Sequence, residues 1–177
     1  MVKPQDLSNE PFSEHHRQDL AASGIPEDLA RRVGLRSASE QEVQQVLGRA
    51  KPVGPGLIIP YPDPDTKQPL HITVGGASVP FVRVRLDDPS KAPDRDGKPS
   101  KYLSRRGAGQ YPYFISEVVD MIAGVQRIIL VEGEKKALSA YAAGLPAIDL
   151  AGNFGWTGKD ANELHPLLTK GPLRNNM

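Results

Sequence analysis

The chain has 177 residues, of which 38% are hydrophobic and 24% are charged, a balance that fits one compact domain or two small ones. Its 22 Lys+Arg residues against 21 Asp+Glu residues give a formal net charge of +1, so binding to polyanions must depend on a local basic cluster. The absence of cysteine excludes disulfides and thiolate metal sites, and the lack of a signal-peptide core or of any apolar run of roughly 20 residues predicts a cytoplasmic protein without membrane contact.

Residues 1–50 carry the signals of three short helices, each followed by a glycine. Ser13 can cap the first helix, and Pro26 suits the first turn of the second. Ser39 and Glu42 have the spacing of a capping box ahead of the third helix. The sequence therefore predicts a helical N-terminal cap over this segment.

A β-rich segment is expected over residues 51–117. Prolines and glycines over residues 51–56 forbid continuation of the helix and mark a linker. Strand-like runs follow at residues 57–59, 70–74 and 81–86. Prolines near these runs favour the edges or ends of a mainly antiparallel sheet.

The last of these runs alternates most cleanly between apolar and polar residues. Period-two geometry places its valines and Leu86 on one face, which should pack into the core. Arg83 and Arg85 then lie on the opposite face, about 7 Å apart. The alternation predicts a strand with one apolar face and one cationic face.

Residues 91–109 are rich in glycine, proline and serine and are predicted to form a loop. This loop is also the local basic cluster of the chain. Guanidinium forks and ammonium groups suit phosphate oxygens, so the cations of the loop and of the neighbouring strand are candidate phosphate contacts. The alternative is a solvated loop beside the open face of an antiparallel sheet. The candidate phosphate-binding residues are Lys101, Arg105, Arg106, Arg83 and Arg85.

Residues 118–177 show a strand, helix, strand pattern. The apolar run at residues 128–131 predicts a strand covered on both faces, residues 134–143 predict the crossover helix, and residues 146–150 predict the second strand. A right-handed βαβ unit with a parallel pair of strands is expected, followed by a weaker helix over residues 161–168. The fold class is therefore α/β, mixed α+β overall.

Glu132 stands between the first of these strands and the crossover helix, on a tight glycine turn. In open α/β sheets, ligands and metal ions are held at the carboxyl ends of strands, so this position suits chemistry. Taken alone, Glu132 can equally be a helix-start acid that interacts with the helix dipole, which is worth about 0.3–1 kcal/mol. Both interpretations remain open on this tract alone.

The run at residues 131–138, Val-Glu-Gly-Glu-Lys-Lys-Ala-Leu, resembles the first motif of the Toprim family. That family is the Rossmann-like domain of bacterial replicative primases, topoisomerases and related phage and plasmid proteins. Upstream, residues 98–104 are similar to the primase segment in which a Pro-Lys-Tyr-Leu run precedes an aromatic-rich strand, matched here by residues 111–114. The order of the motifs over most of the chain resembles an uncharacterised Toprim-associated domain of mobile-element replication proteins.

The resemblance implies a partial Rossmann-like unit in which Glu132 is the catalytic or metal-proximal acid, with Mg²⁺ as the cofactor. It adds Lys135 to the phosphate-binding set and implies nucleic acid or nucleotides as ligands, with a helicase or another replication protein as a further partner. If active, the chain would be a Mg-dependent primase-type nucleotidyltransferase. Its oligomeric state is left open.

The metal site is expected to be incomplete. In the family, an Asp-x-Asp pair at the end of a later strand supplies most of the metal ligands. Hard cations need several oxygen ligands, and one glutamate cannot supply them. Here the Asp-x-Asp sequences at residues 63–65 and 94–96 precede Glu132 and fit turn formers better, and the chain ends where the later strand would begin. We therefore expect no phosphoryl transfer by this chain alone.

Two alternatives remain. The chain can be a non-enzymatic nucleic-acid-binding or assembly module, a truncated remnant that uses the same basic loop. A weaker alternative is a small-molecule α/β domain that uses the Gly133 turn. His15 and His16 lack a glutamate spaced for a zinc site and are expected to be a solvated pair.

Overall fold

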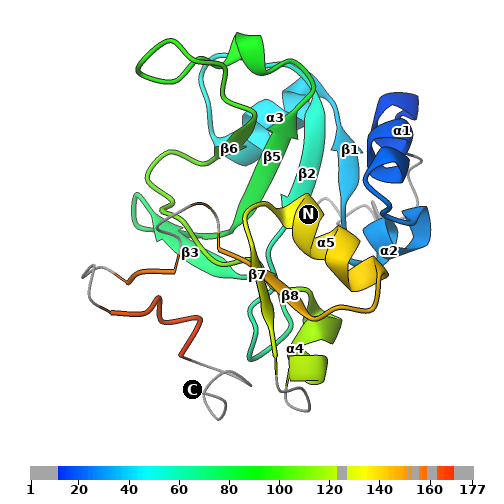
Figure 1. Cartoon of the computed structure of the whole chain (residues 1–177). Coiled ribbons are helices and arrows are strands. Elements are labelled where there is room, and N and C mark those ends of the chain that lie inside the picture. The colour runs from blue at the N-terminus through cyan, green and yellow to red at the C-terminus, as the bar shows by residue number, and fades with distance from the viewer. Residues whose placement is uncertain (1–11, 123–126, 151, 153–155, 159–162, 170–177) are drawn as a thin grey trace, which may run out of the picture.

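The computed structural model describes residues 12–122, 127–150, 152, 156–158 and 163–169 (Figure 1). Within these residues the chain forms N-terminal helices, antiparallel sheets and a small parallel βαβ unit. The predicted α/β class, mixed α+β overall, is confirmed. No helix in this part of the chain is both long enough and apolar enough to span a membrane.

Three short helices open the described chain, as the sequence predicts. They are α1 (Glu14–Ala22), α2 (Glu27–Arg32) and α3 (Glu40–Leu47). The Ser13 hydroxyl accepts a hydrogen bond from the backbone N–H of His16 at 3.2 Å, which satisfies a donor that the start of α1 leaves unpaired. Both hydrogen bonds of the capping box form between Ser39 and Glu42 at the start of α3.

A short strand, β1 (Arg36–Ala38), lies between α2 and α3, where the sequence predicts only helices. It pairs antiparallel with β2 (Gly56–Pro60), and Ser37 lies opposite Leu57. Three residues carry too little local signal to mark a strand. β1 therefore forms because β2 supplies its hydrogen-bonding partner.

The main sheet has four strands in the order β1-β2-β5-β6, and every neighbouring pair is antiparallel. β5 (Val82–Leu86) and β6 (Tyr102–Ser104) complete it. β6 corrects the prediction that residues 91–109 form only a loop. Its tyrosine and leucine favour a strand, but the surrounding prolines and glycines mask that preference until β5 provides a partner. The 3-10 turn η2 (Pro89–Lys91) lies between β5 and β6.

A separate hairpin joins β3 (His71–Val74) to β4 (Ala77–Pro80), and the sequence predicts only its first strand. The turn consists of Gly75 and Gly76, whose φ angles are 59° and 82°. Two-residue hairpin turns of this hand require positive φ at both positions, which glycine adopts without strain. The Gly-Gly pair is the sequence signal that would have identified the hairpin.

The βαβ unit follows α4 (Ser116–Ile122), a helix that the sequence does not predict. Its elements are β7 (Ile129–Val131), α5 (Glu134–Ala142) and β8 (Ala147–Asp149). β7 and β8 pair in parallel, which confirms the predicted parallel pair. The prediction that β7 is covered on both faces is wrong, because Leu130 is 60% exposed while Ile148, opposite it on β8, is buried.

The helix predicted over residues 161–168 does not form in the part that the structure describes; residues 161 and 162 lie outside the described residues. Leu164 forms an isolated bridge with Thr157. A turn follows, in which the backbone N–H of Leu168 donates to the carbonyl of His165 at 2.8 Å.

The two faces of β5 have different surroundings. Val84 and Leu86 are buried against α3, as the alternation predicts. The side chains of Arg83 and Arg85 on the other face are only 23% and 11% exposed, because they form ion pairs with residues of α5 and α1. The alternative of an open, solvated sheet face is therefore wrong.

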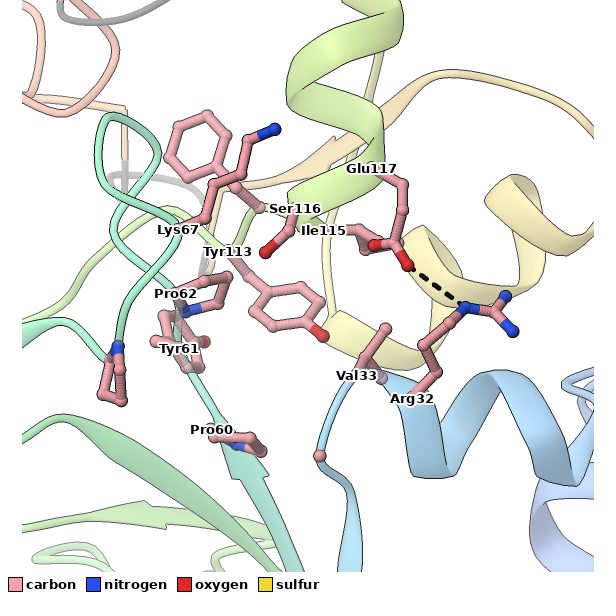
Figure 2. A pocket seen from close by; sticks show the side chains of 13 residues that line it. Arg32, Val33, Pro60, Tyr61, Pro62, Lys67, Tyr113, Ile115, Ser116 and Glu117 are labelled. Carbon is pink, nitrogen blue, oxygen red and sulfur yellow. Dashed lines mark hydrogen bonds and ion pairs between the residues drawn. The ribbon is translucent and has the colours of Figure 1, made fainter. Parts of the chain in front are cut away.

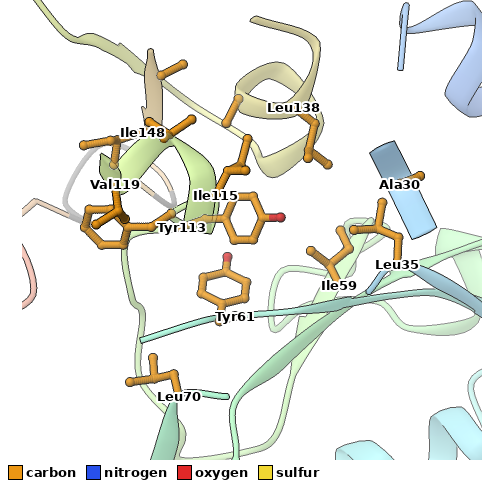
Figure 3. Close-up of a cluster of buried hydrophobic side chains, with 14 of the residues drawn as sticks. Ala30, Leu35, Ile59, Tyr61, Leu70, Tyr113, Ile115, Val119, Leu138 and Ile148 are labelled. Carbon is orange, nitrogen blue, oxygen red and sulfur yellow. The ribbon is translucent and has the colours of Figure 1, made fainter. Parts of the chain in front are cut away.

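One buried cluster contains residues from all three predicted segments, 1–50, 51–117 and 118–177 (Figure 3). Tyr61 and Tyr113 lie in this cluster with their ring centroids 5.0 Å apart in an edge-to-face arrangement. The division of the chain into those three segments stays a prediction.

Candidate nucleic-acid interface

The glutamate turn connects β7 to α5. Gly133 has a φ of 111°, a conformation that residues with a Cβ rarely adopt, so glycine suits this turn. Its backbone N–H donates to Oδ1 of Asp149 at 2.7 Å, and Asp149 pairs with Val131 across the parallel strands. Glu132 is exposed and stands at the same edge of the sheet as the buried Asp149. Asp149 was not predicted as a site residue, although an acid that ends the second strand of a βαβ unit was its signal.

Glu134, two residues further on, is fully buried at the first turn of α5. Its Oε1 lies 2.9 Å from Nη1 of Arg83 and accepts a hydrogen bond from the Tyr61 hydroxyl at 2.7 Å. Burial and the charge of Glu134 raise the pKa of Tyr61 well above its ordinary value, which keeps the phenol neutral. The Arg83 guanidinium also lies 4.9 Å from the centroid of the Tyr102 ring.

This arrangement makes Glu134 a link between α5 and the main sheet. Its Oε2 is buried and makes no hydrogen bond to any residue that the structure describes. Glu134 was not predicted as a site residue, because its burial depends on Tyr61, which is 73 residues away in the chain.

A second ionic group joins α1, β5 and α5. Arg85 contacts both carboxylate oxygens of Asp19, with Nη1 2.9 Å from Oδ2 and Nη2 3.0 Å from Oδ1. Nζ of Lys135 lies 2.6 Å from Oδ2 of the same carboxylate. Burial opposes ionisation of Asp19, but the Lys135 hydrogen bond and the charges of Arg85 and Lys135 outweigh it and lower the pKa of Asp19.

Two of the predicted phosphate-binding residues are exposed. Lys101 immediately precedes β6, and Arg106 lies in the turn after it. Burial is the main cause that lowers the pKa of Lys135, and the charges of Arg85 and Lys101 lower it further. Lys101 is therefore close enough to act electrostatically on Lys135. Arg85 and Lys135 thus place two positive charges against the single carboxylate of Asp19, and the local field favours an anion.

Arg105 has a different position from its neighbour Arg106. It is half-buried, and its Nη2 donates to the backbone carbonyl of Val46 at 3.0 Å near the end of α3. Cationic side chains satisfy the free carbonyls at helix ends in this way. Arg105 therefore joins the β6 segment to the helical cap.

The residues around Glu132 do not provide a complete set of metal ligands. Among the described residues, the group of three or more histidines and carboxylates that lie close enough to share an ion is His15, His16 and Asp87. Glu132 does not belong to that group, and Oδ1 of Asp149 already accepts a backbone hydrogen bond. Mg²⁺ is usually held by one or two carboxylates, with water and substrate phosphates completing its six oxygen ligands, so the exposed Glu132 supplies at most one ligand of such a site.

A hollow of about 280 Å³ lies between the end of β2 and the start of α4, and Figure 2 shows the side chains that line it. Tyr61 and Tyr113 line it, and the ion pair of Arg32 Nε with Glu117 Oε1 crosses its rim at 3.1 Å. None of the predicted site residues lines this hollow. It is therefore separate from the candidate interface.

No family model matches the sequence, and no curated protein matches it. Solved structures match the fold. The zinc-binding and RNA polymerase domains of the Aquifex aeolicus primase are 16% identical at a TM-score of 0.52, over 77% of this chain and 36% of that chain. The E. coli primase catalytic core is 15% identical at a TM-score of 0.52, over 85% of this chain and 52% of that chain.

A DnaG primase catalytic domain bound to single-stranded DNA is 16% identical at a TM-score of 0.51 and covers 84% of this chain and 52% of its own. At these identities the likeness shows the fold alone. The chain spans between 36% and 52% of the length of these three structures. Its fold therefore resembles part of the DnaG primase catalytic core.

Proposed function

We propose that the chain is a Toprim-like, primase-related domain of a phage or plasmid replication protein that contacts nucleic acid or nucleotides. The observation that carries the proposal is the likeness to primase catalytic cores in a chain whose Glu132 stands at the end of a parallel strand. One of those catalytic domains is described as bound to single-stranded DNA, which makes a single strand the first ligand to test.

Lys101 and Arg106 are the proposed first contacts for phosphate, because both are exposed. Arg85 and Lys135 lie behind them, where Asp19 balances part of their charge. A phosphate near Lys101 would experience the charge that Asp19 leaves unbalanced. Arg83 and Arg105, which contact Glu134 and the end of α3, act mainly by holding the sheet and the cap in place.

Binding of a fluorescently labelled single-stranded oligonucleotide tests this assignment. The affinity should fall with salt, and the double variant Lys101→Ala with Arg106→Ala should reduce the salt slope by about 0.7 for each phosphate that the protein no longer neutralises. The double variant Arg17→Ala with Lys67→Ala removes the same charge from exposed positions elsewhere and should retain the slope. An equal reduction in both double variants would contradict the assignment.

The proposal includes the prediction that this chain alone does not catalyse phosphoryl transfer. Glu132 offers one exposed carboxylate, and the sequence holds no Asp-x-Asp pair after it. Primer synthesis and strand cleavage should be undetectable with the purified 177-residue chain at millimolar Mg²⁺. Magnesium-dependent activity that is lost in Glu132→Gln would overturn this prediction and assign Glu132 as the catalytic acid.

The incomplete ligand set favours a second candidate, a non-enzymatic nucleic-acid-binding or assembly module. The variant Glu132→Gln distinguishes the two candidates. A binding module should bind the oligonucleotide equally well after this substitution, with and without Mg²⁺. A site that holds Mg²⁺ through Glu132 should lose the part of its affinity that depends on Mg²⁺.

A further inference from the structure

Two histidines of α1 and an aspartate directly after β5 form a compact group. One ligand atom from each of His15, His16 and Asp87 lies within 4.8 Å of the others. The expectation of a solvated histidine pair is wrong for His16, which is 1% exposed, and holds only for the exposed His15. The third member of the group comes from a residue 71 positions away from His16, so local sequence spacing did not identify it.

The ring of His16 is held on both sides. Its Nδ1 lies 2.7 Å from the hydroxyl of Ser37 and 3.0 Å from that of Ser13. Its Nε2 lies 2.8 Å from Oδ1 of Asp87. The orientation of the ring is thus fixed by three polar partners, with Nε2 directed at the carboxylate.

These contacts admit a proton on Nε2, on Nδ1 or on both, because a serine hydroxyl can donate or accept. If a proton is on Nε2, His16 donates to Asp87 and no ion is needed. If the proton is on Nδ1 alone and is donated to a serine, the Nε2 lone pair faces a carboxylate, and a cation must lie between them. The second pattern is the usual one for a histidine that binds a metal, whose other ring N–H donates to a protein oxygen.

The spacing of the group suits a tetrahedral ion after a small adjustment. Zinc binds imidazole nitrogen and carboxylate oxygen at about 2.0–2.2 Å, which places neighbouring ligand atoms roughly 3.3 Å apart. The His16–Asp87 contact of 2.8 Å must widen slightly, and the other separations, at most 4.8 Å, must close. His15 is exposed and Asp87 has a side-chain exposure of 27%, so both can rotate without disturbing the core.

We infer that His15, His16 and Asp87 form a three-ligand site for Zn²⁺, with water as the fourth ligand. Two imidazole nitrogens and one carboxylate oxygen favour zinc over Mg²⁺, which prefers oxygen ligands. The site shares no residue with the candidate nucleic-acid interface. The ion would join α1 to the end of β5 and thereby hold Asp19, one turn further along α1, beside Arg85.

Titration of the full chain with Zn²⁺ in a calorimeter tests the site, and Co²⁺ serves as a spectroscopic substitute. We expect one ion per chain, a higher unfolding temperature with Zn²⁺, and the visible absorption of tetrahedral Co²⁺. His15→Ala should weaken binding by at least the ~10–100-fold that removal of a supporting partner costs. Because His15 is exposed, this variant should fold normally in the absence of metal.

The matched control is His71→Ala, which removes an exposed histidine on β3 and should leave Zn²⁺ affinity unchanged. Ser37→Ala keeps all three ligands and removes a partner of the His16 ring, and it should weaken binding by about 10–100-fold. Absence of 1:1 binding at micromolar Zn²⁺ would overturn the site. An equal drop in affinity in His71→Ala would likewise overturn it, because it would indicate adventitious binding to surface histidines.

Discussion

The main sheet and the β7–β8 pair differ in how they use charge and burial. In the main sheet, Arg83 and Arg85 lie on the face opposite the α3 core and are paired with carboxylates from α5 and α1. In the parallel pair, Leu130 is 60% exposed and the adjoining turn presents Glu132 to solvent. Charged residues within the sheet therefore hold the fold together, whereas the strand-end turn leaves a carboxylate exposed to solvent.

The same contrast exists between two glutamates of one motif. Glu132 and Glu134 are two residues apart, yet one is exposed and the other is fully buried. Both are carboxylates next to a helix start, so local sequence cannot distinguish them. Only the positions of Tyr61 and Arg83 do so.

Removal of the buried carboxylate should have the greatest consequence. Glu134→Ala leaves Arg83 without its ion pair in a partly buried site and should lower the free energy of unfolding by about 3–5 kcal/mol. Glu132→Ala is the matched control and should change it by less than about 0.5 kcal/mol. Urea unfolding followed by circular dichroism measures both.

A double variant tests whether the ion pair is the cause. The double variant Glu134→Leu with Arg83→Met removes both charges at once. It should lower the free energy of unfolding by less than Glu134→Ala alone. If the double variant loses as much stability as the two single variants together, the two side chains stabilise the fold independently. That result would contradict the contrast between Glu132 and Glu134.

Apolar truncation in the two sheets gives the next largest difference. Leu57→Ala in β2 removes a fully buried side chain from the core and should cost about 2–5 kcal/mol. Leu130→Ala in β7 removes the same atoms from an exposed position and should cost less than about 0.5 kcal/mol. Similar losses of stability in the two variants would indicate that β7 is covered in solution.

The Asp19 group makes stability depend on pH. Because the folded pKa of Asp19 lies below its ordinary value of 3.8, its stabilising contribution is fully present above that pH. The contribution is lost as pH falls through the lowered folded pKa. The difference in free energy of unfolding between the wild type and Asp19→Asn should therefore be constant above about pH 5 and shrink below about pH 3.8. A difference that stays unchanged at about pH 2 would rule out this carboxylate as the source.

A more modest change is expected in binding. Asp19→Asn removes the negative charge beside Arg85 and Lys135 and should raise affinity for a single-stranded oligonucleotide by about fourfold, since one charge roughly 5 Å away in water is worth ~0.8 kcal/mol. Weaker binding in this variant would show that Asp19 positions the interface instead of opposing the anion.

Local signals predicted much of the fold. The capping box at Ser39 and Glu42 identified α3, and the apolar run before Glu132 identified the parallel pair. β1 and β6 were missed because three-residue strands depend on partners far away in the chain. The uncovered face of β7 was missed because an apolar run does not show what packs against it.

The candidate site divides along the same line. Glu132 and Lys101 were identified because each lies in a short motif. The roles of Arg85 and Lys135 were not, because both depend on Asp19, which is 116 residues from Lys135. Arg105 was grouped with Arg106 because they are neighbours in the sequence. In the structure Arg105 donates to a carbonyl at the end of α3, whereas Arg106 is exposed. Composition identifies the cations of this region, and only tertiary contacts distinguish the paired ones from the exposed ones.

The salt dependence of oligonucleotide affinity decides whether exposed cations beside a primase-like core bind a single strand. We predict that log affinity falls linearly with log salt, and that Lys101→Ala with Arg106→Ala lowers the slope by about 1.4, or ~0.7 for each phosphate contact. A slope unchanged by this double variant, or no binding even at low salt, would contradict the proposed interface.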